Sequence, residues 1–353
     1  MMTDILSLSI KELEELLKSK GEPAYRARQI FQWMYRGVTD FADMKNLPAA
    51  LRAKLAEDCV VCSPEILAEQ VSAKDGTRKY LFGLSDGNAV ETVLMRYRYG
   101  WSVCVSSQAG CRMGCRFCAS TVKGLARSLT AGEILAQVIT INRLLAEEGS
   151  AEGGEPARIS HIVVMGTGEP FDNYENLARF IELASAKEGL GLSRRNITVS
   201  TCGIVPMIER FGDEYPQVNL AISLHAATDE KRSALMPVNR KYPVAEVIEA
   251  AKNHASKTGK RVTFEYALTA GKNDTEADLK ALTGLLKGML CHVNLIPLNK
   301  VDGTGLETSG RKRAEEFRDL LEKAGIPATV RRELGSDIDA ACGQLRLRKG
   351  EGV

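Results

Sequence analysis

Three cysteines lie within eight residues of this 353-residue chain, at Cys111, Cys115 and Cys118. They follow an apolar run at 101–107 and precede a helical pattern, which places them on a loop. Cluster irons bind thiolates, and closely spaced loop cysteines supply them with little loss of closure entropy. Three thiolates leave one iron of a four-iron cluster open for another ligand. The spacing therefore predicts a [4Fe–4S] cluster, with a zinc site or buried structural thiols as the alternatives.

Further along the chain, polar or glycine residues follow several apolar runs. The run that begins at Val163 ends in a glycine-rich turn with Gly168 and Glu169. Glycine allows a ligand to approach the backbone closely. The turn does not match a dinucleotide fingerprint, because Phe171 occupies the third glycine position. Polar side chains at the ends of successive strands predict a ligand pocket. The other residues of this kind are Ser200, Ser223 (followed by Leu224 and His225) and Asn299.

From residue 101 onward, short β-type runs alternate with amphipathic helical runs. This alternation predicts an α/β fold with a parallel sheet and crossover helices. About six units favour a partial (β/α)6-type barrel, in which the carboxyl ends of the strands carry the chemistry. The predicted strands are 101–107, 161–165, 197–201, 219–225, 262–268, 292–298 and 327–332. The predicted helices are 131–147, 174–187, 204–212, 244–257, 276–289 and 311–324.

Residues 1–95 have a different pattern and predict a separate module. Leu13, Leu16 and Leu17 fall at helical spacing, and similar patterns follow up to about residue 56. Two β-type runs, 77–82 and 89–95, flank a turn signal at 85–88 and predict a hairpin. We therefore expect a small helical accessory domain with a hairpin at 1–95, and a core domain at 96–353.

Composition limits the classes of protein that this chain can belong to. With 47 basic and 45 acidic residues the net charge is +2, which does not indicate nucleic-acid binding, although a local basic face would suffice for it. No run of 18 apolar residues occurs, so we expect no membrane span. The N-terminus lacks the basic head of a signal peptide. The nine cysteines are an odd number and cluster unevenly, which argues against a disulfide framework. We expect a cytoplasmic protein.

The cysteine motif, with Phe117 before its last cysteine, resembles the signature of the radical S-adenosylmethionine (SAM) superfamily. The segment Gly168-Glu169-Pro170 resembles the superfamily's GGEP segment, although Thr167 replaces the first glycine. Within that superfamily the chain resembles the RlmN family almost from end to end. The sequence segments that show this resemblance are residues 29–33, 37–41, 44–48, 90–92, 104–108, 223–225 and 340–345.

The resemblance implies a specific activity. RlmN enzymes methylate C2 of an adenine in 23S ribosomal RNA and, in bacteria, in transfer RNA. The cofactors implied are a [4Fe–4S] cluster on the three cysteines and SAM, which would contact Gly168, Glu169, Ser200, Ser223, Leu224, His225 and Asn299. Residues 1–95 would contact RNA. The other partner implied is an electron donor such as flavodoxin, and we expect a monomer.

The resemblance also assigns the reacting groups. Cys342 would take a methyl group from one SAM, and a second SAM would yield the radical that activates this methyl group. Glu91 would accept the C2 proton of adenine. Cys104 would release the product through a transient disulfide with Cys342, and Cys202 is an alternative for that thiol. Without the resemblance, Glu91 would be a solvated strand residue and Cys104 a core residue.

Two other functions remain as alternatives. A Cfr-type enzyme shares the cluster and both catalytic cysteines but methylates C8 of adenine. A noncatalytic iron–sulfur protein that binds RNA or senses redox state would share the cluster alone, and would need neither Cys104 nor Cys342. Locating the methyl group distinguishes the first alternative, and SAM cleavage distinguishes the second.

Overall fold

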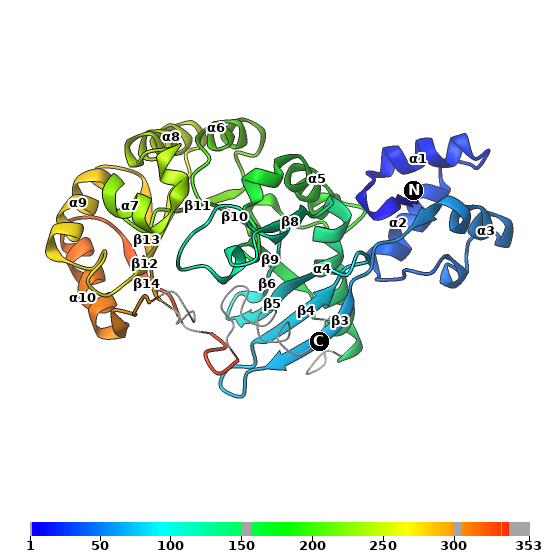
Figure 1. Ribbon diagram of the computed structural model, residues 1–353. Coiled ribbons are helices and arrows are strands. Elements are labelled where there is room, and N and C mark those ends of the chain that lie inside the picture. The colour runs from blue at the N-terminus through cyan, green and yellow to red at the C-terminus, as the bar shows by residue number, and fades with distance from the viewer. Residues whose placement is uncertain (1, 150–156, 299–304, 333, 339–353) are drawn as a thin grey trace.

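A ten-stranded sheet organises the fold, and helices α4 to α10 surround its parallel part (Figure 1). The structure is a computed structural model that describes residues 2–149, 157–298, 305–332 and 334–338. In this part of the chain the strand order is β14-β13-β12-β11-β10-β9-β6-β5-β4-β3. Strands β14 and β3 form the two edges of the sheet, so the barrel is open.

Seven of the strands run parallel, and each is hydrogen-bonded to its neighbour in sequence order. Six helical crossovers connect them, so the predicted (β/α)6-type barrel is confirmed. The strands are β6 (Gly100–Cys104), β9 (Ile159–Val164), β10 (Ile197–Thr201), β11 (Asn219–Ser223), β12 (Val262–Leu268), β13 (Cys291–Pro297) and β14 (Ala328–Val330). The helices are α4 (Ala131–Glu147), α5 (Tyr174–Ser185), α6 (Val205–Glu214), α7 (Asp229–Leu235), α8 (Val244–Thr258), α9 (Glu276–Leu286) and α10 (Gly310–Lys323).

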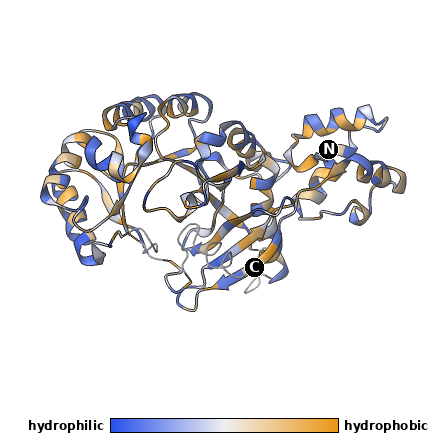
Figure 2. Cartoon of the chain, in the orientation of Figure 1, coloured by the Kyte–Doolittle hydropathy of each residue, from blue (hydrophilic) through white to orange (hydrophobic). Residues whose placement is uncertain are grey.

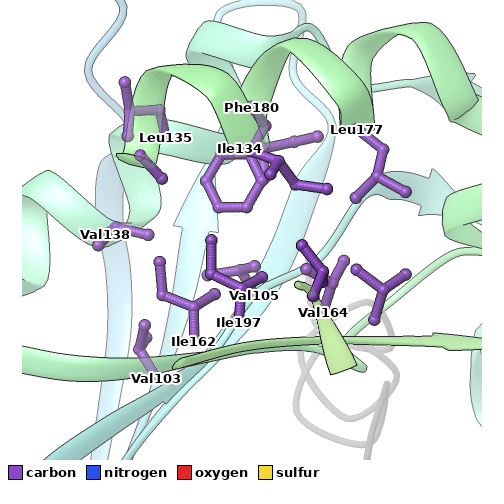
Figure 3. Close-up of a cluster of buried hydrophobic side chains, with 14 of the residues drawn as sticks. Val103, Val105, Ile134, Leu135, Val138, Ile162, Val164, Leu177, Phe180 and Ile197 are labelled. Atoms are coloured by element: carbon purple, nitrogen blue, oxygen red, sulfur yellow. The ribbon is translucent and has the colours of Figure 1, made fainter. Parts of the chain in front are cut away.

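The apolar residues that gave the sequence its strand and helix patterns are the residues that form the core between the sheet and the helices. Helix α4 begins at a capping box, in which Thr130 and Glu133 bond each other's backbone N–H groups, and it occupies the predicted range. Its apolar side chains and those of α5 pack on alternate residues of β6, β9 and β10 (Figure 3). Because Val103 and Val105 face these helices, Cys104 between them faces the concave side of the sheet.

Three antiparallel strands extend the sheet beyond β6. They are β3 (Glu65–Val71), β4 (Arg78–Gly83) and β5 (Ala89–Tyr97). The hairpin that we expected in the accessory domain therefore shares its sheet with the core. The expected division at residue 95 falls inside β5, because residues 93–97 of β5 pair with β6. The domain boundaries stay a prediction.

The helical N-terminal part lies to one side of the barrel (Figure 1). It contains α1 (Ile10–Ser19), α2 (Arg26–Tyr35) and α3 (Ala49–Asp58), with a short parallel pair, β1 (Thr3–Asp4) and β2 (Cys59–Val60). Hydrophobic residues of the three helices face inward (Figure 2). The Gly132 N–H at the start of α4 donates to the Ser7 hydroxyl, which joins this part to the barrel. No helix in the described ranges is long and apolar enough to cross a bilayer.

Candidate functional site

The three-cysteine loop is framed by a small hairpin that the sequence pattern did not predict, β7 (Gln108–Gly110) with β8 (Leu125–Ser128). Inside it, the Thr121 hydroxyl donates to the carbonyls of Cys115 and Cys118, at 3.1 and 2.9 Å. Gly110 has φ +81°, and a Cβ there would lie 2.0 Å from the Gly124 carbonyl oxygen. Only glycine fits this position, so the closure of the loop depends on it.

The three thiols of this loop line one cavity of about 240 Å³. Cys111 and Cys115 are buried and Cys118 is half-buried. Burial raises the pKa of the Cys111 thiol to about 12 and raises the pKa of Cys115 as well. Iron binding must therefore displace protons from these thiols.

The donor set of this loop fits an iron–sulfur cluster. Among the described residues, no three His, Cys, Asp or Glu side chains are arranged to hold a single metal ion. This arrangement is compatible with a cluster of several irons. In a four-iron cluster each thiolate binds a different iron, so the thiols do not share one ligand sphere. Cys111, Cys115 and Cys118 would hold three corners of such a cluster.

Most of the predicted SAM-contacting residues line the same cavity. Gly168 and Glu169 follow β9, Ser200 lies on β10, and Ser223 and His225 lie at the end of β11. Parallel pairing brings these carboxyl ends side by side, as the sequence pattern predicted. Leu224 differs: its side chain is fully buried in the core. The remaining predicted residues, Asn299 and Cys342, lie outside the described residues.

Glu169 has a carboxylate that the backbone holds in place. Its Oε2 accepts from the Cys202 N–H at 2.7 Å, and its Oε1 accepts from the Phe171 N–H at 3.0 Å. Burial raises its pKa. An ammonium group of a ligand in the cavity would favour the charged carboxylate. The preceding Gly168 approaches Gln108 too closely for a Cβ, which would lie 2.8 Å from the Gln108 nitrogen.

His225 is neutral, with one defined tautomer. Its Nδ1 lies 2.9 Å from the Ala267 nitrogen and accepts that N–H, so Nε2 carries the proton. Burial, with a contribution from Arg232, lowers its pKa to about 3. Its ring stands edge-on to Phe117 at 4.6 Å between centroids. His225 is therefore a fixed hydrogen-bond donor on the wall of the cavity.

Arg232 on α7 is a fully buried side chain that the sequence did not reveal. Its guanidinium donates to the carbonyls of Cys202 at 2.6 Å, Leu224 at 3.1 Å and Ser223 at 3.3 Å. It also donates to Asn239 Oδ1 at 2.9 Å. These bonds connect the ends of β10 and β11, on which the polar residues of the cavity stand. A seven-residue helix is too short to show a period in the sequence.

We expect Arg232→Met to destabilise the protein by about 3 kcal/mol, because several buried carbonyls lose their donors. The measurement is urea unfolding of the iron-free protein. The matched control is Arg210→Met on α6, a surface arginine that pairs with Glu175 and Glu214; its loss should destabilise the protein much less, because surface ion pairs contribute little to stability. Equal losses in the two variants would contradict the role given to Arg232.

The concave face of the sheet carries Glu91 and Cys104. Cys104 is directly opposite Val93 in the β5–β6 ladder, so Val93, Cys104 and Glu91 share one face. Burial raises the pKa of Cys104 to about 11. Its neighbours include Met165, which lines the cavity. Cys104 therefore lies next to the cavity wall.

Glu91 is only 3% exposed and its Oε1 lies 3.3 Å from the Nζ of the equally buried Lys79. The alternative of a solvated strand residue is therefore wrong. A second buried carboxylate, Glu265 on β12, lines the cavity and accepts from Asn294 Nδ2 at 2.8 Å. Burial raises the pKa of Glu265. Nothing in the sequence distinguishes it from an ordinary strand residue.

Comparison with known proteins agrees with this geometry. Residues 3–61 match the profile of the ribosomal RNA large subunit methyltransferase N-terminal domain, and residues 105–286 match the radical SAM superfamily. A probable dual-specificity RNA methyltransferase RlmN of Clostridium perfringens is 52% identical over 346 residues, covering 98% of this chain and 97% of the relative. The chain belongs to the RlmN family.

Two further matches support the family assignment. The RlmN relative of Geobacillus kaustophilus is 50% identical and covers 99% of this chain and 93% of its own length. The crystal structure of a radical SAM methyltransferase from Sphaerobacter thermophilus superposes with a TM-score of 0.91 at 46% identity, covering 97% of this chain and 98% of that one. The radical SAM fold that the cysteine motif indicated is therefore confirmed.

Of the cysteines predicted to react, Cys104 and Cys202 are among the described residues and Cys342 is not. The described cysteines are all free thiols, so the structure does not support a disulfide among them. The expected partner of Cys104 is Cys342, which lies outside the described residues, and this pairing stays a prediction. The alternative thiol, Cys202, lines the cavity and packs beside Cys115.

Proposed function

We propose that this protein methylates C2 of adenine in 23S ribosomal RNA and in transfer RNA, with two molecules of SAM and a [4Fe–4S] cluster. The observation that carries the proposal is one cavity that joins the three-cysteine loop to the polar ends of β9, β10 and β11, in a member of the RlmN family. Relatives named dual-specificity RNA methyltransferases support both RNA substrates.

The residues of the cavity would bind and orient SAM. Glu169 offers acceptor oxygens to its ammonium group, and Ser200, Ser223 and the Nε2–H of His225 offer further polar contacts. Gly168 lets the ligand approach the backbone. When bound at the cluster, SAM supplies the radical that activates the methyl group carried by Cys342.

Glu91 would accept the proton of C2 after the carbon of that methyl group has joined the ring, and the radical adduct would lose its unpaired electron to the [4Fe–4S] cluster. Its carboxylate lies on the concave face, and its contact with Lys79 orients it. Cys104 would then attack the sulfur of Cys342. The S–S bond forms as the carbon–sulfur bond breaks, the electron pair passes to the methylene carbon, and protonation there completes the methyl group. Two electrons from a thiol reductant restore both thiols.

The decisive experiment is nucleoside analysis of RNA treated with the reconstituted protein, SAM and a reductant. We expect 2-methyladenosine in both ribosomal and transfer RNA. 8-Methyladenosine would instead support the Cfr-type alternative. Intact SAM and unmodified RNA, with a full complement of iron, would favour the noncatalytic alternative.

We expect Glu91→Gln to slow methylation by roughly 10²- to 10⁴-fold, because the amide cannot accept the C2 proton. Iron content and SAM cleavage should remain, which separates this effect from misfolding caused by the loss of the ion pair between Glu91 and Lys79. The control is Glu65→Gln, an exposed glutamate on the edge strand β3. If Glu91→Gln methylates RNA at the control's rate, Glu91 has no role as a base.

The remaining partners belong to this proposal as well. Reductive cleavage of SAM needs one electron, for which a flavodoxin-type donor is suitable. The N-terminal module at 1–95 would contact the RNA, and we propose a monomeric, cytoplasmic enzyme.

A further inference from the structure

The segment that follows β14 reaches the tip of the β3–β4 hairpin. We call residues 334–338 the strap and residues 72–77 the hairpin turn. In Figure 1 the red strap lies beside the tip of this blue hairpin. The two segments are some 260 residues apart in the sequence, yet hydrogen bonds join them. The strap therefore connects the two edges of the open sheet.

Each segment contributes one carboxylate, and that carboxylate accepts hydrogen bonds from the other segment. Asp337 of the strap accepts from the Ser72 hydroxyl at 2.7 Å and from the Ala73 N–H at 3.0 Å. Asp75 of the hairpin turn accepts from the Gly335 N–H of the strap at 2.9 Å. Hydrogen bonds lower the pKa of both carboxyl groups, so both are ionised at neutral pH. Charge-assisted bonds of this kind are stronger than neutral ones. We call this set of bonds the clasp.

The hairpin turn is a preorganised anchor for the strap. Its backbone is closed by bonds from Ser72 N–H to the Thr77 carbonyl at 2.8 Å and from Gly76 N–H to the Ser72 carbonyl at 3.1 Å. Asp75 Oδ1 accepts from the Thr77 N–H at 3.0 Å, while its Oδ2 bonds the strap. Gly76 has φ +72°, which the turn requires. Formation of the clasp therefore costs little further conformational entropy in the hairpin turn.

The strap also lies against the concave face on which the resolving thiol stands. Leu334 packs against Val93, Met95 and Cys104. At the other end of the strap, Ile338 is buried. The clasp thus fixes the chain close to Cys104 and five residues before Cys342.

We propose that the clasp positions Cys342 for its reactions, with Asp75 and Asp337 as positioning residues; this inference rests on the proposed function, which gives Cys342 its role. Five residues span at most about 18 Å, so an anchored Asp337 confines the thiol to a small region. Without the clasp, the strap keeps the packing of Leu334 and Ile338 and the bond from Lys74 Nζ to the Ser336 hydroxyl, but loses the bonds that fix Asp337 and Gly335 to the hairpin turn. The effective concentration of a tethered thiol falls when its tether becomes longer or less well oriented.

The experiment compares the wild type with the double variant Asp75→Ala plus Asp337→Ala. Each reconstituted protein is given RNA, SAM and a reductant, and the deoxyadenosine formed is divided by the methylated adenine formed. We expect this ratio to rise roughly two- to tenfold in the double variant, because SAM is cleaved while Cys342 is out of place. Iron content should equal that of the wild type. The matched control is Glu249→Ala, an exposed carboxylate on α8.

A second measurement, which does not depend on enzyme activity, tests whether the clasp holds the strap in place. Hydrogen exchange of the amides of residues 334–338 should speed up in the double variant and stay unchanged in Glu249→Ala, while the melting temperatures agree. Ser72→Ala, which removes one bond of the clasp and the two bonds that the Ser72 hydroxyl accepts from the Lys74 and Asp75 N–H groups, should give an intermediate ratio. If wild-type protein is inactive on RNA, the proposed function fails. If wild-type protein is active and the double variant has the same ratio and exchange, the clasp proposal alone is overturned.

Discussion

Replacing Cys115 by alanine is expected to reduce the iron content from about four atoms per chain to less than one, since a cubane needs all three of its protein thiolates. Cys115 is buried in the cavity wall next to Cys202 and Met236. RNA methylation and SAM cleavage should both disappear. Iron analysis and visible absorption of the reconstituted protein measure the first effect, and product analysis the second.

The matched control for this experiment is Cys62→Ala. Cys62 is a half-buried free thiol whose backbone N–H bonds to Asp4 at the base of the N-terminal module. This variant should keep its full iron content and its activity. An active Cys115→Ala protein without iron would contradict the cluster assignment, and so would equal iron loss in the two variants.

Replacing Cys104 by alanine is expected to trap protein and RNA in a covalent adduct through Cys342. Once the methylene carbon of Cys342 has joined the adenine, only a second thiol can release it by attacking the sulfur. A disulfide needs its two Cα atoms within about 7 Å, and the strap brings the chain against Cys104 through Leu334. The variant should therefore yield at most one adduct per chain and no released methylated RNA. Denaturing gel electrophoresis of the purified variant, with and without nuclease, measures this.

Cys202→Ala is the comparison that decides between the two candidate thiols. Cys202 lines the cavity beside the cluster loop, whereas Cys104 lies on the concave face with Glu91. We expect no adduct with Cys202→Ala, and none with Cys104→Ala plus Cys342→Ala. An adduct with Cys202→Ala and not with Cys104→Ala would assign the resolving role to Cys202.

Sequence patterns located the regular elements because those elements are coded locally. Helix α4 was predicted at 131–147 and occupies those residues, since an apolar period and a Thr130–Glu133 capping box act within a few residues of each other. Among the elements that were not predicted, α7 and the β7–β8 hairpin are short and lack a readable period. Their role is to hold the cysteine loop, as in the bond from the Arg116 N–H to the Leu235 carbonyl.

By itself, the sequence determined the family and the barrel and predicted the cluster cysteines, because a closely spaced motif and the alternation of strands and helices are local properties of the chain. It also placed Gly168, Ser200 and Ser223 at strand ends, which parallel pairing then brings together. Only the tertiary structure decided that Glu91 is buried against Lys79, that Arg232 joins the ends of β10 and β11, and that Asp337 is held by the hairpin turn. The physical reason is that burial and hydrogen bonding depend on segments that are distant in sequence, and no pattern within a single segment records which distant groups will meet.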